Sequence, residues 1–165
     1  MSSDDPNTRR PVGELGRKLA HLANEIAERR GGSATYLGEG KSAAVFRLDG
    51  SNDPEALKIY DPIFFEGSNP ELERARIRMQ MSLRGHGCHT LVDFIEAGDI
   101  RTTAYLIMEY LPWRPLDECL LSLPRDQIRA IVAQVAEAAR FLDGQGFCHR
   151  DIKTANVMVS PDRFC

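Results

Sequence analysis

The sequence predicts an α+β protein, in which strand patterns occupy the middle of the chain and helical patterns lie on either side of them. Three observations favour this class. An amphipathic stretch covers 12–32, short apolar stretches separated by turn residues fill 36–109, and apolar residues at helical spacing recur after Pro124. At 165 residues the chain is long enough to bury a real core.

The composition argues against several classes of protein. Lysine and arginine (21) nearly balance aspartate and glutamate (24), and the net charge of −3 does not favour a nucleic-acid partner. No apolar run approaches the ~20 residues that cross a bilayer, and the N-terminus does not resemble a signal peptide, so no membrane partner is expected. The cysteines form no Cys-x-x-Cys pair and indicate a reducing, cytoplasmic location; they are Cys88, Cys119, Cys148 and Cys165.

The first elements are a polar lead-in and a helix. Residues 1–11 are polar and contain two prolines, so we expect them to be disordered. Residues 12–32 predict an amphipathic helix that ends at a glycine pair, with its apolar stripe formed by Val12, Leu15, Leu19, Leu22 and Ile26. The helix is too short for a lasting coiled coil. Docking in cis on the following domain is favoured over docking on a partner.

A glycine turn and a strand with a lysine follow. Residues 36–48 have strand-like ends around Gly38 and Gly40, and glycines let the backbone bring its N–H groups close to phosphates. Residues 56–60 read as an apolar strand that Lys58 interrupts. A buried, unpaired ammonium is costly, so Lys58 is expected to have an anionic partner.

The next predicted elements are a helix and two strands. Asn69 and Pro70 begin a helix that runs to about Leu83, with Leu72, Ala75, Met79 and Leu83 on its apolar face. Residues 91–96 and 104–109 predict strands joined by a polar turn at 98–101. Between helix and strands, His86, Cys88 and His89 cluster, but they lack a fourth ligand and favour a solvated loop over a metal site.

The last third predicts a short helical turn at 116–121 and a long helix that ends at Gly144 and Gly146. The apolar stripe of the long helix is Ile128, Ile131, Val132, Val135, Ala139 and Leu142. A polar loop follows, in which Asp151, Lys153 and Asn156 can meet over one substrate. They suit phosphoryl transfer: the carboxylate accepts a hydroxyl proton, the ammonium steadies the phosphoryl group, and the carboxamide oxygen binds Mg²⁺.

This loop, His149-Arg150-Asp151-x-Lys153-x-x-Asn156, closely resembles the catalytic loop of eukaryotic-type (Hanks-type) serine/threonine protein kinases. Ala56-x-Lys58 resembles the lysine strand of the family. The resemblance implies an α+β, kinase-like fold with a five-stranded antiparallel small lobe and one helix at 33–111. The first helices and catalytic loop of a helical large lobe would follow at 112–165.

The resemblance also implies ATP and Mg²⁺ as cofactors and a protein as substrate. The implied nucleotide-binding residues are Leu37, Gly38, Gly40, Ser42, Val45, Ala56, Lys58, Glu73, Met108, Glu109 and Leu111. Asn156 is the implied metal ligand. Glu73 is the candidate partner of Lys58 and Glu71 the reserve, provided that 84–89 is an inserted loop; counting without a gap places Met79 there instead.

The sequence departs from the family in some places. Ala43 stands where a third glycine is usual, and 112–115 contains two prolines. No Asp-Phe-Gly follows by Cys165, although the resemblance covers 33–165. We therefore expect residues 1–165 alone to be a poor catalyst, with the stripe around Ile131 and Val135 exposed. Two alternatives stay open: a non-catalytic nucleotide- or partner-binding module, and a phosphotransferase for a small molecule.

Overall fold

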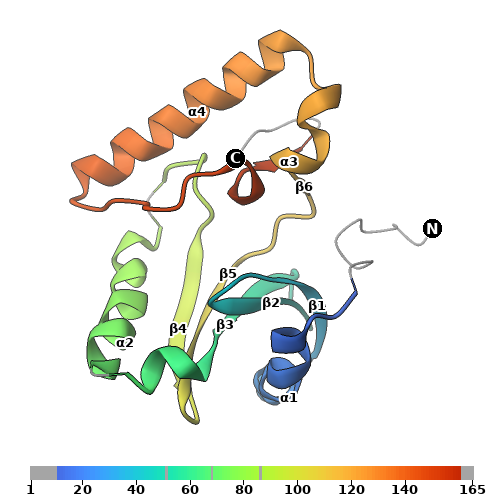
Figure 1. Ribbon diagram of the computed structural model, residues 1–165, viewed down its shortest axis with the longest axis vertical. Helices are drawn as coiled ribbons and strands as arrows, with labels where there is room; N and C mark the ends of the chain where they lie inside the picture. The colour runs from blue at the N-terminus through green and yellow to red at the C-terminus, as the bar shows by residue number, and fades with distance from the viewer. Residues whose placement is uncertain (1–10, 51, 68, 86, 161–165) are drawn as a thin grey trace. The chain divides into compact units, whose positions relative to one another are not determined.

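The computed structural model describes residues 11–50, 52–67, 69–85 and 87–160, which form two compact units. The first unit contains the described residues up to 85 together with 93–110, and the second contains 87–92 and 111–160. Figure 1 gives the elements of each unit. Among the described residues, no helix is both long and apolar enough to span a membrane. The predicted lead-in, residues 1–11, lies outside this description except for Pro11.

The first unit is built on a five-stranded antiparallel sheet, which confirms the predicted small-lobe sheet. The strands are β1 (Ser33–Glu39), β2 (Ala43–Asp49), β3 (Glu55–Tyr60), β4 (Phe94–Ile100) and β5 (Thr103–Glu109). Their order across the sheet is β1-β2-β3-β5-β4. Side chains of paired residues point to the same face of a sheet, so the register decides which residues meet on each face.

The N-terminal helix α1 (Glu14–Arg29) covers one face of the sheet and contacts β1, β2 and β3 (Figure 1). Its stripe packs into a cluster with Phe46, Leu57 and Ile107 of the strands. The helix residues that are almost fully buried there are Leu19, Leu22, Ala23, Ile26 and Ala27. The expected docking in cis is therefore confirmed. The predicted bounds of 12–32 were too wide, because Gly13 is the N-cap and Val12 lies before the helix, 42% exposed. Removal of this apolar stripe from water holds the helix on the sheet.

Helix α2 (Pro70–Met79) lies against β4 and β5 together with the short helices η2 (Pro62–Phe65) and η3 (Gln80–Leu83). Asn69 caps α2, because its side chain accepts a hydrogen bond from the Leu72 N–H at 3.1 Å. The predicted apolar face was wrong at three positions: Leu72 is 44% exposed, Met79 is 55% exposed, and Ala75 is exposed as well.

Helix α2 instead packs through Ile77 and Arg74, with Ile77 in a cluster that includes Phe65 and Ala104. The Arg74 guanidinium lies 4.8 Å from the centre of the Phe65 ring and pairs with Asp99. An arginine whose charge is neutralised and whose stem covers an aromatic ring takes a core-facing position. Apolar periodicity does not reveal such a position.

Strand β4 is shifted relative to the predicted 91–96: residues 91–93 lie outside it, and it runs from Phe94 to Ile100. Gly98, Asp99 and Ile100 were expected in a turn, but they pair with Tyr105, Ala104 and Thr103 of β5. Ile100 is buried in the cluster under α1, which explains why the strand continues to this residue. The turn is confined to Arg101 and Thr102, and Arg101 adopts a left-handed conformation with φ of 51°.

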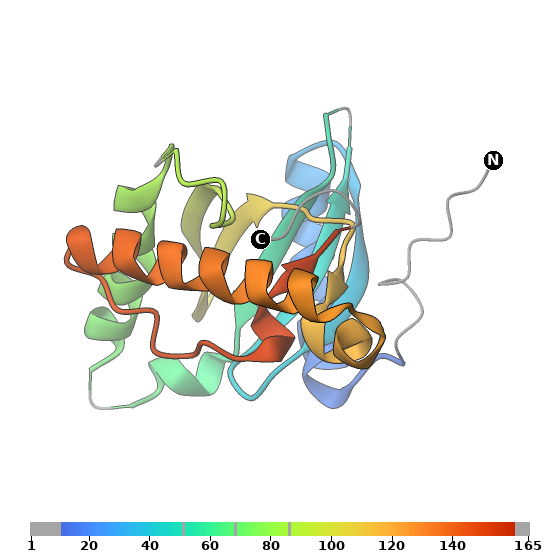
Figure 2. The same cartoon turned by 90° about the horizontal axis from the view of Figure 1, so that it is seen from above.

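The second unit contains α3 (Leu116–Cys119), η4 (Leu120–Ser122), the long helix α4 (Arg125–Gly144) and η5 (Thr154–Asn156). A two-stranded pair, β6 (Arg114–Pro115) with β7 (Met158–Val159), completes it. Beyond α4 the chain runs back alongside the helix (Figure 2).

A small core holds the second unit together: Leu116, Ile131, Val157 and Val159 are buried in one cluster, with Val135 packed against it. The expectation that the stripe around Ile131 stays exposed was therefore wrong for Ile131, because Val157 and Val159, which follow the loop at 149–156, pack in the same cluster. Val132, which was predicted on the same stripe, is exposed.

Candidate active site

One face of the sheet collects the predicted nucleotide-binding residues of the strands. Val45 on β2 pairs with Lys58 on β3, and Lys58 pairs in turn with Leu106 on β5. Two residues before Lys58 on β3, Ala56 pairs with Met108 on β5. Since paired residues and residues two apart share a face, Val45, Ala56, Lys58 and Met108 all lie on one side. The residues packed under α1, such as Leu57 and Ile107, alternate with them and face the other side.

Lys58 provides the positive charge on this face. Its Nζ lies 5.0 Å from the centre of the Tyr60 ring, two residues along the same strand. Within the described part of the chain, no carboxylate lies within the 4.0 Å of an ion pair from Lys58. A half-buried ammonium among apolar side chains favours an anion, so this face is suited to a phosphate group. Tyr60 was not among the predicted site residues, although its spacing from Lys58 on a strand places it there.

The structure does not bring Glu73 to Lys58. The Glu73 Oε1 accepts a hydrogen bond from Arg76 Nη1 at 2.5 Å, and Glu71 lies 3.8 Å from Arg74 Nε. Each glutamate thus has a cation one turn away on its own helix, where such pairs form at little entropic cost. The partnership with Lys58 that the resemblance implied is not formed.

The glycine turn lies between β1 and β2. Gly38 pairs with Val45, and the Gly40 N–H donates to the Ala43 carbonyl at 2.9 Å, which closes the turn. Gly40 does not adopt a positive φ, and a Cβ at this position would meet no described atom within 4 Å. Neither backbone conformation nor crowding within the described residues demands this glycine. Close approach of a ligand is a remaining physical reason for it.

The catalytic-loop residues of the second unit converge on Asp151. Its Oδ2 accepts a hydrogen bond from Asn156 Nδ2 at 2.9 Å and lies 3.0 Å from Lys153 Nζ. Asn156 Nδ2 also donates to the Asp151 backbone carbonyl at 2.8 Å. The hydrogen bond from Lys153, followed by that from Asn156, lowers the pKa of Asp151 below its ordinary value. The structure therefore brings all three predicted residues together around an ionised carboxylate.

Local backbone features hold the loop in this shape. Gly146 has a φ of 78°, which a glycine adopts without strain, and it turns the chain away from α4. Arg150 also lies in the left-handed region, with a φ of 63°, directly before Asp151. At the far end, Val157 is buried and its carbonyl accepts a hydrogen bond from the Leu116 N–H at 2.8 Å.

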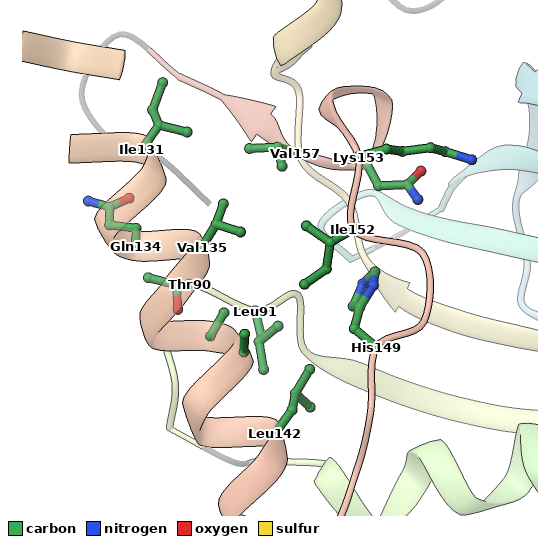
Figure 3. Close-up of a pocket in the computed structure, with 13 residues that line it drawn as sticks. Thr90, Leu91, Ile131, Gln134, Val135, Leu142, His149, Ile152, Lys153 and Val157 are labelled. Atoms are coloured by element: carbon green, nitrogen blue, oxygen red, sulfur yellow. The ribbon is translucent and has the colours of Figure 1, made fainter. Parts of the chain in front are cut away.

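The inner side of the loop packs toward α4 around an apolar pocket (Figure 3). Ile152 points into this pocket from the loop, while the Lys153 ammonium points away from α4. Within the described residues, the buried Gln134 Oε1 of α4 has no hydrogen-bond partner. The alternation of Ile152 with Asp151 and Lys153 fixes which side of the loop is polar, and it leaves the polar side chains exposed to a substrate.

The described residues contain no group of three His, Cys, Asp or Glu side chains that could hold a metal ion. Of the cluster near residue 88, His86 lies outside the described residues, and the Cys88 Sγ lies 3.1 Å from Thr90 Oγ1. The side chain implied to bind Mg²⁺ is Asn156, whose carboxamide oxygen is the kind of ligand that this ion prefers. Because Asn156 uses its Nδ2 to bind Asp151, its Oδ1 stays available as a hard oxygen ligand.

Comparisons with known proteins agree with this geometry. The family model described as protein kinase domain matches residues 33–164. Serine/threonine-protein kinase GL21140 of Drosophila persimilis is 29% identical over 133 residues, which cover 78% of this chain and 17% of that protein. Serine/threonine-protein kinase unc-51 of Caenorhabditis elegans is 28% identical over 130 residues, 74% of this chain and 15% of that protein.

Solved structures support the fold. The crystal structure of the PknI kinase domain of Mycobacterium tuberculosis, C20A mutant, superposes with a TM-score of 0.69 at 21% identity. The match covers 81% of this chain and 57% of that domain. The chain thus spans a little over half of the solved kinase domain and a smaller share of the curated relatives.

Proposed function

The chain belongs to the protein kinase domain family, and on that premise we propose that it forms the nucleotide-binding and catalytic-loop part of a serine/threonine protein kinase. The proposed reaction transfers the terminal phosphoryl group of ATP to serine or threonine hydroxyls of a protein substrate. The observation that carries the proposal is the convergence of Lys153 and Asn156 on one oxygen of Asp151. We also propose a cytoplasmic location, because the free cysteines Cys88, Cys119 and Cys148 suit a reducing compartment.

In this proposal each catalytic-loop residue has one role. Asp151, kept ionised by its neighbours, accepts the proton of the substrate hydroxyl as the oxygen attacks phosphorus. Lys153 is exposed and cationic, and it neutralises charge on the phosphoryl group during transfer. Asn156 holds the Asp151 carboxylate in place through Nδ2.

The first unit is proposed to bind the nucleotide. Val45, Ala56 and Met108 offer apolar surface to the adenine ring, and Lys58 pairs with the phosphates. The backbone of Glu109 and Leu111 is proposed to bind the edge of the base. The turn between β1 and β2 covers the phosphates, with contributions from Leu37, Gly38, Gly40 and Ser42.

Mg²⁺ is the metal that fits this proposal, with Asn156 as its protein ligand in the described part of the chain. When bound, Mg²⁺ neutralises charge on the phosphate oxygens. Asn156 is exposed, and its Oδ1 is the oxygen proposed to bind the metal.

Titration calorimetry with MgATP tests the nucleotide site directly. The chain is expected to bind MgATP, and Lys58→Met is expected to weaken binding about tenfold or more, since a charge-assisted bond to phosphate is lost. Arg129→Met is the matched control, because Arg129 is an exposed cation of the second unit that lies 3.6 Å from Asp126 on its own helix. Equal affinity of Lys58→Met and wild type would refute the role of Lys58.

Lys58 pairs with neither Glu73 nor Glu71, which are held by arginines of their own helix, and this favours a second candidate: a module that binds the nucleotide without turning it over. This candidate predicts MgATP binding by residues 1–165 with no phosphate transfer. Transfer by the purified chain that disappears in Lys58→Met would eliminate it.

A further inference from the structure

The first turn of α1 is bound to the end of β1. The Gly16 N–H donates to Glu39 Oε2 at 2.5 Å, and the Gly13 N–H donates to the Tyr36 hydroxyl at 3.4 Å. Gly13 occupies the N-cap position of α1, where no side chain of the helix caps the free N–H groups. Glu39 therefore supplies from a strand the acceptor that a helix normally obtains from its own N-cap residue, and its negative charge suits the positive end of the helix.

A β-bulge brings Glu39 to this position. Tyr36 and Glu39 are three residues apart, a spacing that places side chains on opposite faces of a regular strand. Here the register shifts between Tyr36 and Gly38, so that Tyr36 pairs with Phe46 and Glu39 pairs with Ala44. Phe46 and Ala44 are both buried in the cluster under α1. The extra residue thus turns both Tyr36 and Glu39 toward the helix.

Two glycines of α1 permit the close approach. A Cβ at Gly13 would collide with the Glu39 carboxylate, and a Cβ at Gly16 would collide with the Tyr36 ring. Glycine inside a helix ordinarily costs stability relative to alanine. At residue 16 the contact with β1 explains why glycine is present in spite of that cost.

The rest of α1 is anchored to the body of the sheet. Its buried stripe packs on the strands, and ion pairs tie it at several further places. These pairs are Lys18 with Asp61, Glu25 with Arg101, and Arg30 with both Glu55 and Glu96. Because α1 is held by these contacts, the bond from Gly16 to Glu39 fixes the end of β1 against a firmly docked element.

We propose that Glu39 is a positioning residue for nucleotide binding, through which α1 holds the turn between β1 and β2 in one conformation. The inference rests on the proposed nucleotide site. Glu39 directly precedes Gly40, and its neighbour Gly38 pairs with Val45 on the face that carries Lys58. Fixing one end of a glycine-containing turn before the ligand arrives lowers the entropy cost of binding.

The MgATP affinities of Glu39→Ala and Glu39→Gln distinguish a positioning role of Glu39 from a simple effect of its charge. If Glu39 acted only by its charge, its removal would strengthen binding of the anionic nucleotide in both variants. If Glu39 positions the turn, Glu39→Ala is expected to weaken MgATP binding about three- to tenfold, as expected for the loss of the hydrogen bond from the Gly16 N–H. Glu39→Gln keeps an acceptor oxygen and is expected to bind at least as tightly as wild type. Glu28→Ala, an exposed charge at the far end of α1, is the matched control and is expected to change nothing.

A second variant disrupts the contact between α1 and β1 by a change in the helix. Gly16→Ala leaves Glu39 intact but collides with Tyr36, so it is expected to weaken MgATP binding to a similar extent. Amide hydrogen exchange gives an independent readout, because the Gly16 N–H is expected to exchange faster in Glu39→Ala than in wild type.

Each result decides the matter. Undiminished affinity in Glu39→Ala, or equal weakening in Glu39→Ala and Glu39→Gln, would overturn the inference and leave the proposed function intact. Failure of the wild-type chain to bind MgATP would refute the nucleotide site and the inference with it.

Discussion

Asn156 holds Asp151 at two points, because its Nδ2 donates to the carboxylate Oδ2 at 2.9 Å and to the backbone carbonyl at 2.8 Å. A single amide group thereby fixes both the backbone and the side chain of the aspartate. The same Oδ2 lies 3.0 Å from Lys153 Nζ. The carboxylate is oriented without being buried, which suits its proposed contact with a protein substrate.

The first prediction concerns the pKa of Asp151, which Lys153 lowers more than any other neighbour. Lys153→Met is expected to raise this pKa toward the ordinary value, because the carboxylate loses its hydrogen-bonded cation. A carboxyl-detected NMR titration measures it, with Arg150→Met as a control for general loss of charge on the loop. An unchanged pKa in Lys153→Met would show that the pair does not form in solution.

The same shift has a consequence for stability. Because the pKa of Asp151 is depressed in the folded protein, its interactions contribute stability above the unfolded-state pKa, and the contribution is lost as the pH falls through the folded-state pKa. The free energy of unfolding is expected to fall less at acid pH in Lys153→Met than in wild type. Asp151 is fully exposed, so the effect is expected to be small.

The second prediction concerns the core under α1. Leu19 is 1% exposed within the cluster that joins α1 to the sheet. Leu19→Ala is expected to destabilise the first unit by ~2–5 kcal/mol, because it loses apolar burial and leaves a cavity. Native-state hydrogen exchange at the amides of Leu57 and Ile59 measures this. Val12→Ala, at an exposed position just before the helix, is expected to change exchange little. Unaltered protection of β3 in Leu19→Ala would mean that α1 does not support the sheet.

The third prediction concerns Tyr105, whose hydroxyl donates to Glu96 Oε1 at 2.5 Å. Burial, followed by this hydrogen bond, raises the pKa of Tyr105 to about 12 from an ordinary 10.0. The folded protein therefore holds this proton more tightly than the unfolded chain. The resulting stability is present below the ordinary pKa and is lost as the pH rises through the folded-state value.

Ultraviolet absorbance measures this ionisation as the difference between wild type and Tyr105→Phe. The difference is expected to titrate with a midpoint of about 12, and to return to about 10 when both proteins are unfolded in denaturant. A midpoint near the ordinary value in the folded protein would show that Glu96 does not accept the Tyr105 proton.

The sequence predicted best those features that depend on neighbours along the chain. Asp151, Lys153 and Asn156 lie within six residues, and a short loop with helix and strand on either side leaves them little room to separate. The face shared by Val45 and Lys58 likewise follows from two adjacent strands, whose alternation the sequence displays.

Features that depend on contacts between residues far apart in the sequence could not be predicted in this way. Arg74 lies on the packed face of α2 because it contacts the Phe65 ring and forms an ion pair with Asp99. The sequence of a helix does not indicate such partners for a polar residue. Ile100 belongs to a strand because α1, far away in sequence, covers it. The bond between Gly16 and Glu39 depends on a bulge, which leaves no periodic signal in a strand.

The most direct measurement of the central claim is phosphate transfer by the native protein, purified from its source, compared with its Asp151→Asn variant. Labelled ATP, Mg²⁺ and a serine- or threonine-containing protein substrate are supplied, and MgATP affinity is measured in parallel. We expect wild type to label serine or threonine, and Asp151→Asn to lose transfer by about a hundredfold or more while its affinity for MgATP is kept. Equal transfer by the two proteins would contradict the assignment of Asp151 as the catalytic base.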